Sequence, residues 1–208
     1  AALDAQVSER LFKAAALARS TPTLWRAAEG AMSPAICALA QWTDLVVLGQ
    51  YEWEGAVERH PLSLAEAVAV DCGRPVLVVP ATIGEGRMRR ALIAWDGSRE
   101  AVRALHDSLP VLREAKTTVE VAMIDDHASG GLEPLFDHLR RHQIGVEEEV
   151  HLHKSGSTAD ALVERLKQGH FDLLIMGAFG HPVWIEFLFG GTTPSALFNA
   201  TTPVLISH

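Results

Sequence analysis

Two short motifs occur twice in this chain, and both repeats have the same spacing. DLVVLG (residues 44–49) is matched by DLLIMG (172–177), and RPVLVVP (74–80) is matched by TPVLISH (202–208). One offset of 128 residues relates both pairs. Matched segments at a common offset indicate that the chain contains two copies of one structural unit.

The repeated segments also predict the fold class. They are short, rich in β-branched residues and bounded by turn residues, which is typical of buried strands. The stretches between them have apolar residues at helical spacing. Strands that alternate with helices form βαβ units, so we expect an α/β fold with an open parallel sheet and helices on both faces.

The second copy contains every element of the unit. We expect Ser98 to cap its first helix, and Thr193 to cap a short helix that begins at Pro194. The expected strands are residues 89–95, 117–126, 146–156, 172–177 and 203–207, and the expected helices are 98–115, 131–143, 157–170 and 194–200.

The first copy is incomplete. The offset of 128 residues places its first strand, first helix and second strand ahead of Ala1, so we expect the sequence to open in the second helix of the unit, at residues 4–20. We interpret residues 1–80 as a first copy truncated at its N-terminus, 81–88 as a short linker and 89–208 as the complete second copy. So few strands make a poor independent domain, and we expect the first copy to pack against the second.

Charge and composition limit the class of partner. The formal net charge is -8, which argues against nucleic acid or an anionic membrane as the main partner. The apolar runs are too short to cross a bilayer. Cys37 and Cys72 do not make a disulfide framework, and we interpret them as reduced thiols of a cytoplasmic protein.

The candidate ligand site lies where strands of the second copy end, because open parallel sheets bind ligands at their carboxyl edge. Residues 96–98, 124–126 and 177–180 follow three of these strands. Glycine N–H groups and the helix N-terminus at Thr193 favour a phosphate-bearing ligand. The loop has neither a Walker A lysine nor a GxGxxG turn, so we expect backbone donors, hydroxyls and Mg²⁺ to hold the phosphates.

Gly177, Gly180 and Gly190 form a G-x-x-G motif followed, after nine residues, by a third glycine, a short helix and PVLI. With ALIAWDGS at residues 91–98, this pattern resembles the nucleotide-binding signature of the universal stress protein family. The resemblance covers nearly the whole chain as a tandem pair. It implies a flavodoxin-like, Rossmann-like sheet with the two copies related by a pseudo-twofold axis. It also implies that the last strands pair antiparallel, between the copies or in a homodimer.

The resemblance further implies that the second copy binds ATP and acts in a stress response as a sensor or regulator. It implies adenine contacts for Ala94, Asp96 and Ile124, and ribose and phosphate contacts for Gly177, Gly180, Gly190, Gly191 and Thr192. No residue is placed as a general base for hydrolysis, so we expect no catalytic residue and, at most, slow ATP hydrolysis.

Two departures from the family pattern bear on this site. The family has Ser or Thr directly after the third glycine, where this chain has Gly191 and places its hydroxyl one residue later, on Thr192. In the first copy, Glu52 stands at the position of Gly180. We therefore expect the first copy to bind no nucleotide.

Alternative interpretations remain for several of these residues. The glycine loop is also compatible with a tight turn, which would make the protein a stress-related interaction or dimerisation module without nucleotide. Asp125 and Asp126 suit either Mg²⁺ or a plain turn. His138 and His142 have metal-ligand spacing on a helix, but the missing third ligand favours a solvated helix face over a zinc site.

Overall fold

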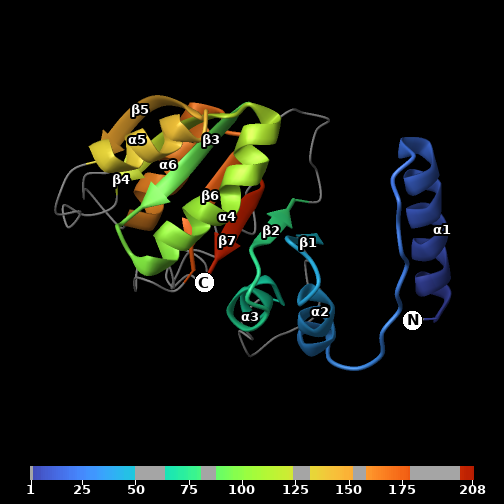
Figure 1. Ribbon diagram of the computed structural model, residues 1–208. Coiled ribbons are helices and arrows are strands. Elements are labelled where there is room, and N and C mark those ends of the chain that lie inside the picture. Colours follow the sequence, from blue (N-terminus) through green and yellow to red (C-terminus); the bar gives the residue numbers. More distant parts are fainter. Residues whose placement is uncertain (1, 50–63, 81–87, 124–131, 152–157, 179–201) are drawn as a thin grey trace.

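A computed structural model describes residues 2–49, 64–80, 88–123, 132–151, 158–178 and 202–208 (Figure 1). The helices are α1 (Ala2–Arg19), α2 (Met32–Ala40), α3 (Leu64–Asp71), α4 (Arg99–Ala115), α5 (Glu133–Arg141) and α6 (Thr158–Gly169). The strands are β1 (Val46–Gly49), β2 (Val76–Val79), β3 (Arg90–Trp95), β4 (Thr118–Met123), β5 (Gly145–His151), β6 (Leu173–Gly177) and β7 (Val204–Ser207). The expected helix at 194–200 lies outside the described residues.

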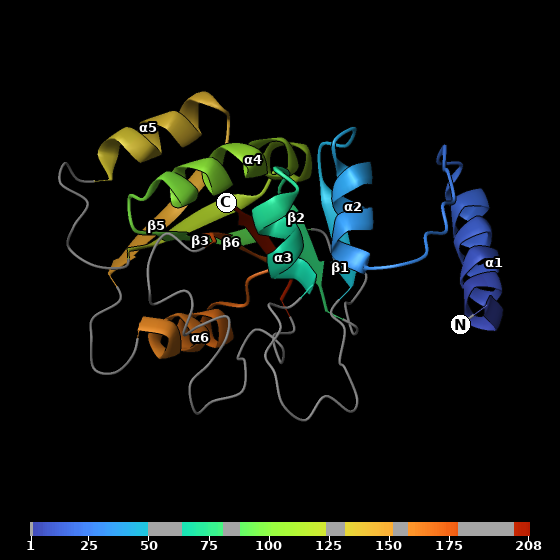
Figure 2. The same ribbon diagram turned by 90° about the horizontal axis from the view of Figure 1, so that it is seen from below.

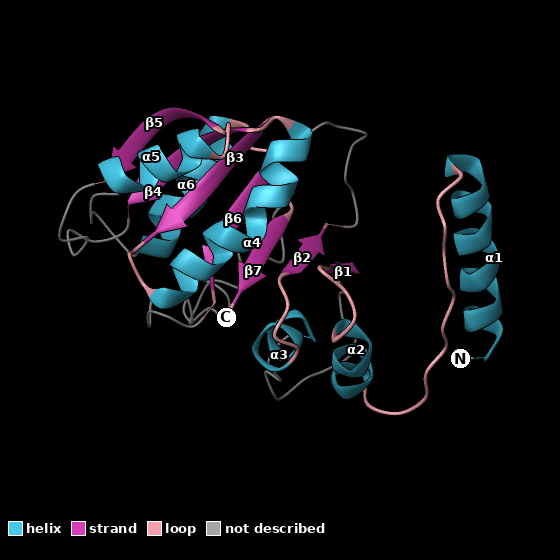
Figure 3. Cartoon of the chain, viewed as in Figure 1, coloured by secondary structure: helices cyan, strands magenta, loops and turns pink. Residues whose placement is uncertain are grey.

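The described strands form one sheet in the order β1-β2-β7-β6-β3-β4-β5 (Figure 3). All neighbours run parallel except β2 and β7. The expected α/β fold with an open, mostly parallel sheet is confirmed. The antiparallel pairing expected for the two last strands is also confirmed, and it occurs within the chain.

The two repeated strand pairs have the same register. Val46 lies opposite Val76 in one pair, and Leu174 lies opposite Val204 in the other, each shifted by the sequence offset. The first ladder bond is repeated too, because the N–H of Val46 donates to Pro75 at 3.0 Å and that of Leu174 to Pro203 at 2.9 Å. The repeated sequence therefore specifies a repeated backbone arrangement.

Two hydrophobic cores sandwich the sheet. One lies under α4 and α5 and contains Leu105, Leu112, Leu139, Ile93 and Ile175. The other contains residues of α2, α3 and α6 packed on the opposite side chains of the strands. Figure 2 shows α6 across the sheet from α4 and α5. Alternate side chains of each strand point to opposite faces, so every central strand contributes to both cores.

The helix α1 confirms the helix expected at residues 4–20 but stands apart from the sheet in both views (Figures 1 and 2). Phe12 packs on Trp25 with ring centroids 5.5 Å apart. Cys37 and Cys72 are both free thiols, and burial raises the pKa of Cys72. Among the helices that the structure describes, none is long and apolar enough to span a bilayer.

Candidate ligand-binding edge

A tight turn follows β3 at the carboxyl edge of the sheet. The Asp96 carboxylate accepts a hydrogen bond from the backbone N–H of Ser98 at 2.9 Å. Gly97 has φ +75°, a left-handed conformation that favours glycine. The turn therefore needs both residues, and it leaves the Asp96 side chain half-buried at the strand end.

The turn leads into a capped helix. Ser98 is the N-cap of α4, and its hydroxyl oxygen accepts from the Ala101 N–H at 3.2 Å. This confirms the cap expected from the sequence. The N–H groups of a first helical turn lack intrahelical acceptors and carry the positive end of the helix dipole. The cap already satisfies the Ala101 N–H, and the positive end of the α4 dipole lies at this edge.

Gly177 ends β6 directly beneath the start of α4. A Cβ at Gly177 would lie 2.5 Å from the Ala101 nitrogen and 2.7 Å from the Glu100 Cβ, closer than side chains tolerate. The next residue, Ala178, is fully buried and donates its N–H to the Ser207 carbonyl at 2.7 Å. Glycine is therefore required here so that the helix can rest on the strand end.

The Ala94 side chain lies below this edge. It is 1% exposed and belongs to the same core cluster as Met176 and Ala178. Of the sequence-expected ligand residues, the structure thus brings together Ala94, Asp96 and Gly177; Ile124, Gly180, Gly190, Gly191 and Thr192 lie outside the described residues.

The electrostatics of the edge include one acidic neighbour. Glu100 lies in the first turn of α4, and its carboxylate pairs with Arg99 at 2.8 Å. An anion beside this turn would meet the helix dipole, the Arg99 guanidinium and the Glu100 carboxylate together.

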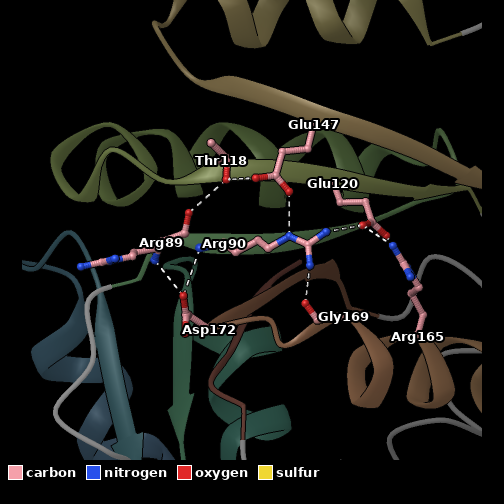
Figure 4. A network of polar contacts seen from close by, with 8 residues as sticks. All are labelled: Arg89, Arg90, Thr118, Glu120, Glu147, Arg165, Gly169 and Asp172. Atoms are coloured by element: carbon pink, nitrogen blue, oxygen red, sulfur yellow. Dashed lines mark hydrogen bonds and ion pairs between the residues drawn. The ribbon is translucent and has the colours of Figure 1, made fainter.

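The opposite edge of the sheet carries a charged network that the sequence did not reveal (Figure 4). Glu120 of β4 is fully buried and accepts from Arg165 at 2.5 Å and from Arg90 at 3.1 Å. Both guanidinium groups lie over the Phe171 ring, 4.7 Å from its centroid for Arg90 and 5.8 Å for Arg165. Two guanidinium groups, those of Arg90 and Arg165, thus compensate the single carboxylate charge of Glu120.

Surface residues extend this network. Arg90 also donates to Glu147 at 2.7 Å, and the Thr118 hydroxyl donates to the other oxygen of Glu147 at 2.6 Å. The hydrogen bond from Thr118 has the largest effect and that from Arg90 the next largest, and together they hold the pKa of Glu147 below its usual range. Asp172 accepts from the backbone N–H groups of Arg89 and Arg90 at 2.8 and 3.1 Å, which ties β3 to β6. The network fixes the amino ends of four strands, away from the candidate ligand edge.

Three histidines stack between α4 and α5. The His106 and His138 ring centroids are 4.8 Å apart, and those of His138 and His142 are 4.7 Å apart. The His138 ring is half-buried, and its Nε2 has no hydrogen-bond partner in the part of the chain that the structure describes. The expected solvated face of His138 and His142 is only partly exposed, because His106 of α4 contacts His138.

The stack does not form a metal site. Within the described residues, no three His, Cys, Asp or Glu side chains are placed to hold one metal ion. His106 instead donates Nδ1–H to the Val102 carbonyl at 2.8 Å. Burial, followed by the positive neighbours His106, His142 and Arg141, lowers the pKa of His138.

Comparisons with solved structures agree with this fold. A universal stress protein from Archaeoglobus fulgidus DSM 4304 is 20% identical with a TM-score of 0.63, and the match covers 84% of this chain and 64% of that one. A universal stress protein assigned in Pseudomonas aeruginosa UCBPP-PA14 is 14% identical with a TM-score of 0.57, covering 96% and 77%. The chain thus spans about two-thirds of the length of the archaeal protein. A search of curated protein sequences finds no match.

The fold is that of an α/β protein with an open, mostly parallel sheet. A family model described as the universal stress protein family matches residues 88–208, more than half of the chain. The chain therefore belongs to the universal stress protein family, and the resemblance found in the sequence is confirmed.

Proposed function

We propose that this protein binds ATP with its second repeat and acts in the cytoplasm as a sensor or regulator of a stress response. Ala94, Asp96 and Ile124 line the adenine side. Ribose and phosphates lie against the glycine loop, at Gly177, Gly180, Gly190, Gly191 and Thr192, and Mg²⁺ accompanies the phosphates.

One observation carries the proposal. The Asp96 turn, the N-terminus of α4 and Gly177 meet at a single point of the carboxyl edge, where a Cβ on the glycine would be 2.5 Å from Ala101. A helix start, a half-buried carboxylate and a strand-end glycine together provide anion donors and a hydrogen-bond acceptor. These are the groups that a ribose phosphate requires.

The family gives general support for a nucleotide ligand. One solved universal stress protein is a complex with cAMP. Its likeness to this chain is low, with 21% identity and a TM-score of 0.39, so it carries no argument about the site residues here. It does establish that nucleotide binding occurs in the family.

We further propose that residues 1–80 are a partial first repeat, 81–88 a linker and 89–208 a complete repeat, with a pseudo-twofold axis at the β2–β7 seam. Support comes from the shared register of the β1–β2 and β6–β7 pairs on either side of that seam. The first repeat has Glu52 at the Gly180 position, and a carboxylate there would repel phosphate. Nucleotide binding is thus confined to the second repeat.

A second candidate function is an interaction module that binds no nucleotide. The observation that favours it is exposed apolar surface in the first repeat, where Trp42 is 88% exposed, with Leu39 and Val47 also exposed. Isolated apolar side chains are common on surfaces, but a group on adjacent elements is typical of contact sites.

Thermal unfolding with and without Mg-ATP separates these functions. At a ligand concentration of a hundred times Kd, binding to the folded state adds about 2.7 kcal/mol of stability and raises Tm. We expect this shift for the natural sequence and its loss in Gly180→Glu, which copies the residue of the first repeat. Glu52→Gly is the matched control and should leave the shift unchanged. An unchanged Tm for the natural sequence at millimolar Mg-ATP would favour the interaction module.

A further inference from the structure

A row of three histidines lies where α5 meets α4. His106 belongs to α4, His138 lies in the last turn of α5, and His142 follows that helix directly. The ring centroids are 4.8 Å apart between His106 and His138 and 4.7 Å apart between His138 and His142. Histidine changes its charge near pH 6.5, so this contact between two helices can gain up to about three positive charges over a narrow pH range.

His138 is the middle ring of the row, and its Nε2 is enclosed. That nitrogen is buried and has no hydrogen-bond partner among the residues that the structure describes. A neutral imidazole has one N–H donor, whereas an imidazolium has two and needs an acceptor for each. Protonation would therefore add positive charge around a buried ring nitrogen that has no acceptor, which destabilises the packed arrangement of α5.

The groups that act on the charge of His138 all oppose it. Burial has the largest effect and lowers the pKa of His138, and His106, His142 and Arg141 lower it further. His106 reaches the ring from α4, while the other two lie at the carboxyl end of α5. The negative end of the α5 dipole favours positive charge at this place. Burial and the three neighbours outweigh it, since the pKa is lowered.

Carboxylates on the same two helices pair with other cations. Glu133 and Asp137 of α5 both contact Arg140, at 3.0 and 3.2 Å. On α4, the Asp107 carboxylate lies 3.8 Å from the Arg103 guanidinium. Within the described residues, no carboxylate is among the groups that shift the pKa of the middle histidine. A protonated row would therefore meet repulsion without a compensating negative charge.

The helix that carries His138 is short and covers one end of the sheet. α5 has nine residues, and its Leu135 and Leu139 are 7% and 0% exposed. They belong to the core under α4 and α5, where Val146 of the end strand β5 packs against them. Short elements at the end of a sheet can open locally while the rest of a protein stays folded. A repulsive contact with α4 would favour such an opening of α5.

We propose that the row of His106, His138 and His142 is a pH-sensitive contact that holds α5 against α4 while neutral and releases α5 when protonated. In the open state the rings reach water and bind protons more readily, so opening becomes more frequent as the pH falls below about 6.5. Opening exposes the apolar face of α5 and leaves α6 and the central strands in place. The device requires no nucleotide, so it is independent of the proposed ATP site.

Amide hydrogen exchange of the 208-residue protein at about pH 7.5 and about pH 5.5 tests this device. The rates are expressed as protection factors, which correct for the intrinsic effect of pH on exchange. We expect the protection of residues 133–141 to fall at least about threefold at the lower pH, because the open state binds more protons. Residues 158–169 of α6, across the sheet, should lose less protection than α5 does.

Three variants assign the effect to the middle histidine. His138→Phe keeps an aromatic ring in the row without a titrating nitrogen, so the fall in protection of α5 should disappear. His138→Gln makes the same test if the phenylalanine variant does not fold. His170→Asn removes an exposed histidine and should leave the fall intact. The proposal is overturned if the natural sequence shows no fall, if α6 loses as much protection as α5, or if the fall persists without His138.

Discussion

Gly177 and Ala101 approach so closely that a Cβ on the glycine would lie 2.5 Å from the alanine nitrogen. This contact joins the end of β6 to the start of α4, the two elements that frame the candidate ligand edge. Packing alone explains why β6 ends in a glycine. The same contact places the first turn of α4 beside the end of the strand.

Replacing Gly177 with alanine should therefore destabilise the protein. The added methyl group must displace the first turn of α4, and overpacking of this kind costs about 1–3 kcal/mol. Gly49→Ala is the matched control, because the same methyl group enters open space in β1 and a strand alanine is if anything favourable. Urea unfolding measures both variants. Equal free energies of unfolding for the two would contradict the close packing.

The buried carboxylate of Glu120 supports a second prediction. Glu120→Ala leaves the guanidinium groups of Arg90 and Arg165 without their shared partner, and breaking a buried ion pair costs about 3–5 kcal/mol. Glu147→Ala removes an exposed partner of the same Arg90, so it should cost much less. Denaturant unfolding of both variants gives the comparison. If Glu147→Ala lowered the free energy of unfolding as much as Glu120→Ala, the burial of Glu120 would not determine how much these ion pairs stabilise the protein.

The histidine stack predicts a stability that depends on pH. The pKa of His138 is lowered in the folded state from the ordinary value of 6.5, first by burial. Below about pH 6.5 the unfolded state then binds more protons, so the free energy of unfolding falls as the pH falls, until the folded-state pKa is passed. Urea unfolding at pH 7.5 and about pH 5.5 should show this loss.

His138→Phe keeps an aromatic ring in the stack without a titrating nitrogen. It should reduce the difference in stability between the two pH values. His170→Asn, at an exposed left-handed residue, is the control and should leave that difference intact. A difference that survives in His138→Phe would place the pH dependence elsewhere.

Asp172 and Asp44 make a matched pair for testing the repeat itself. Asp172→Ala removes the acceptor of two backbone N–H groups and should cost about 1–3 kcal/mol. Asp44→Ala should cost little in the isolated protein, since no described residue donates to it. Thermal unfolding of the two variants measures the contrast. A comparable loss at Asp44 would mean that its carboxylate already has a structural partner.

Local patterns predicted much of this fold because they encode it directly. The repeats DLVVLG and DLLIMG predicted the strands β1 and β6, although β1 is only partly buried at the end of the sheet, and Ser98 before a helical apolar pattern predicted the cap of α4. The antiparallel seam followed from the family resemblance. Each of these features depends on residues that are close in the sequence or on the single offset of 128 residues that relates the two repeats.

The unpredicted features depend on contacts between distant segments. Nothing near Glu120 of β4 in the sequence indicates that Arg165, on the helix α6, lies 2.5 Å away. The His138 and His142 spacing was visible, but their packing against His106 arises only when α5 lies beside α4. At the candidate ligand edge, Asp96 and Gly177 were identified from strand ends, while the role of Gly177 under α4 required the structure.

Isothermal titration with ATP tests the proposed nucleotide site most directly. With Mg²⁺ present, we predict saturable heat at one site per chain for the natural sequence and for Glu52→Gly. We predict none for Gly180→Glu and weakened binding for Asp96→Ala, with all variants folded. Absence of binding heat in the natural sequence at ATP concentrations up to the millimolar range, or equal heat in Gly180→Glu, would contradict nucleotide binding at this edge.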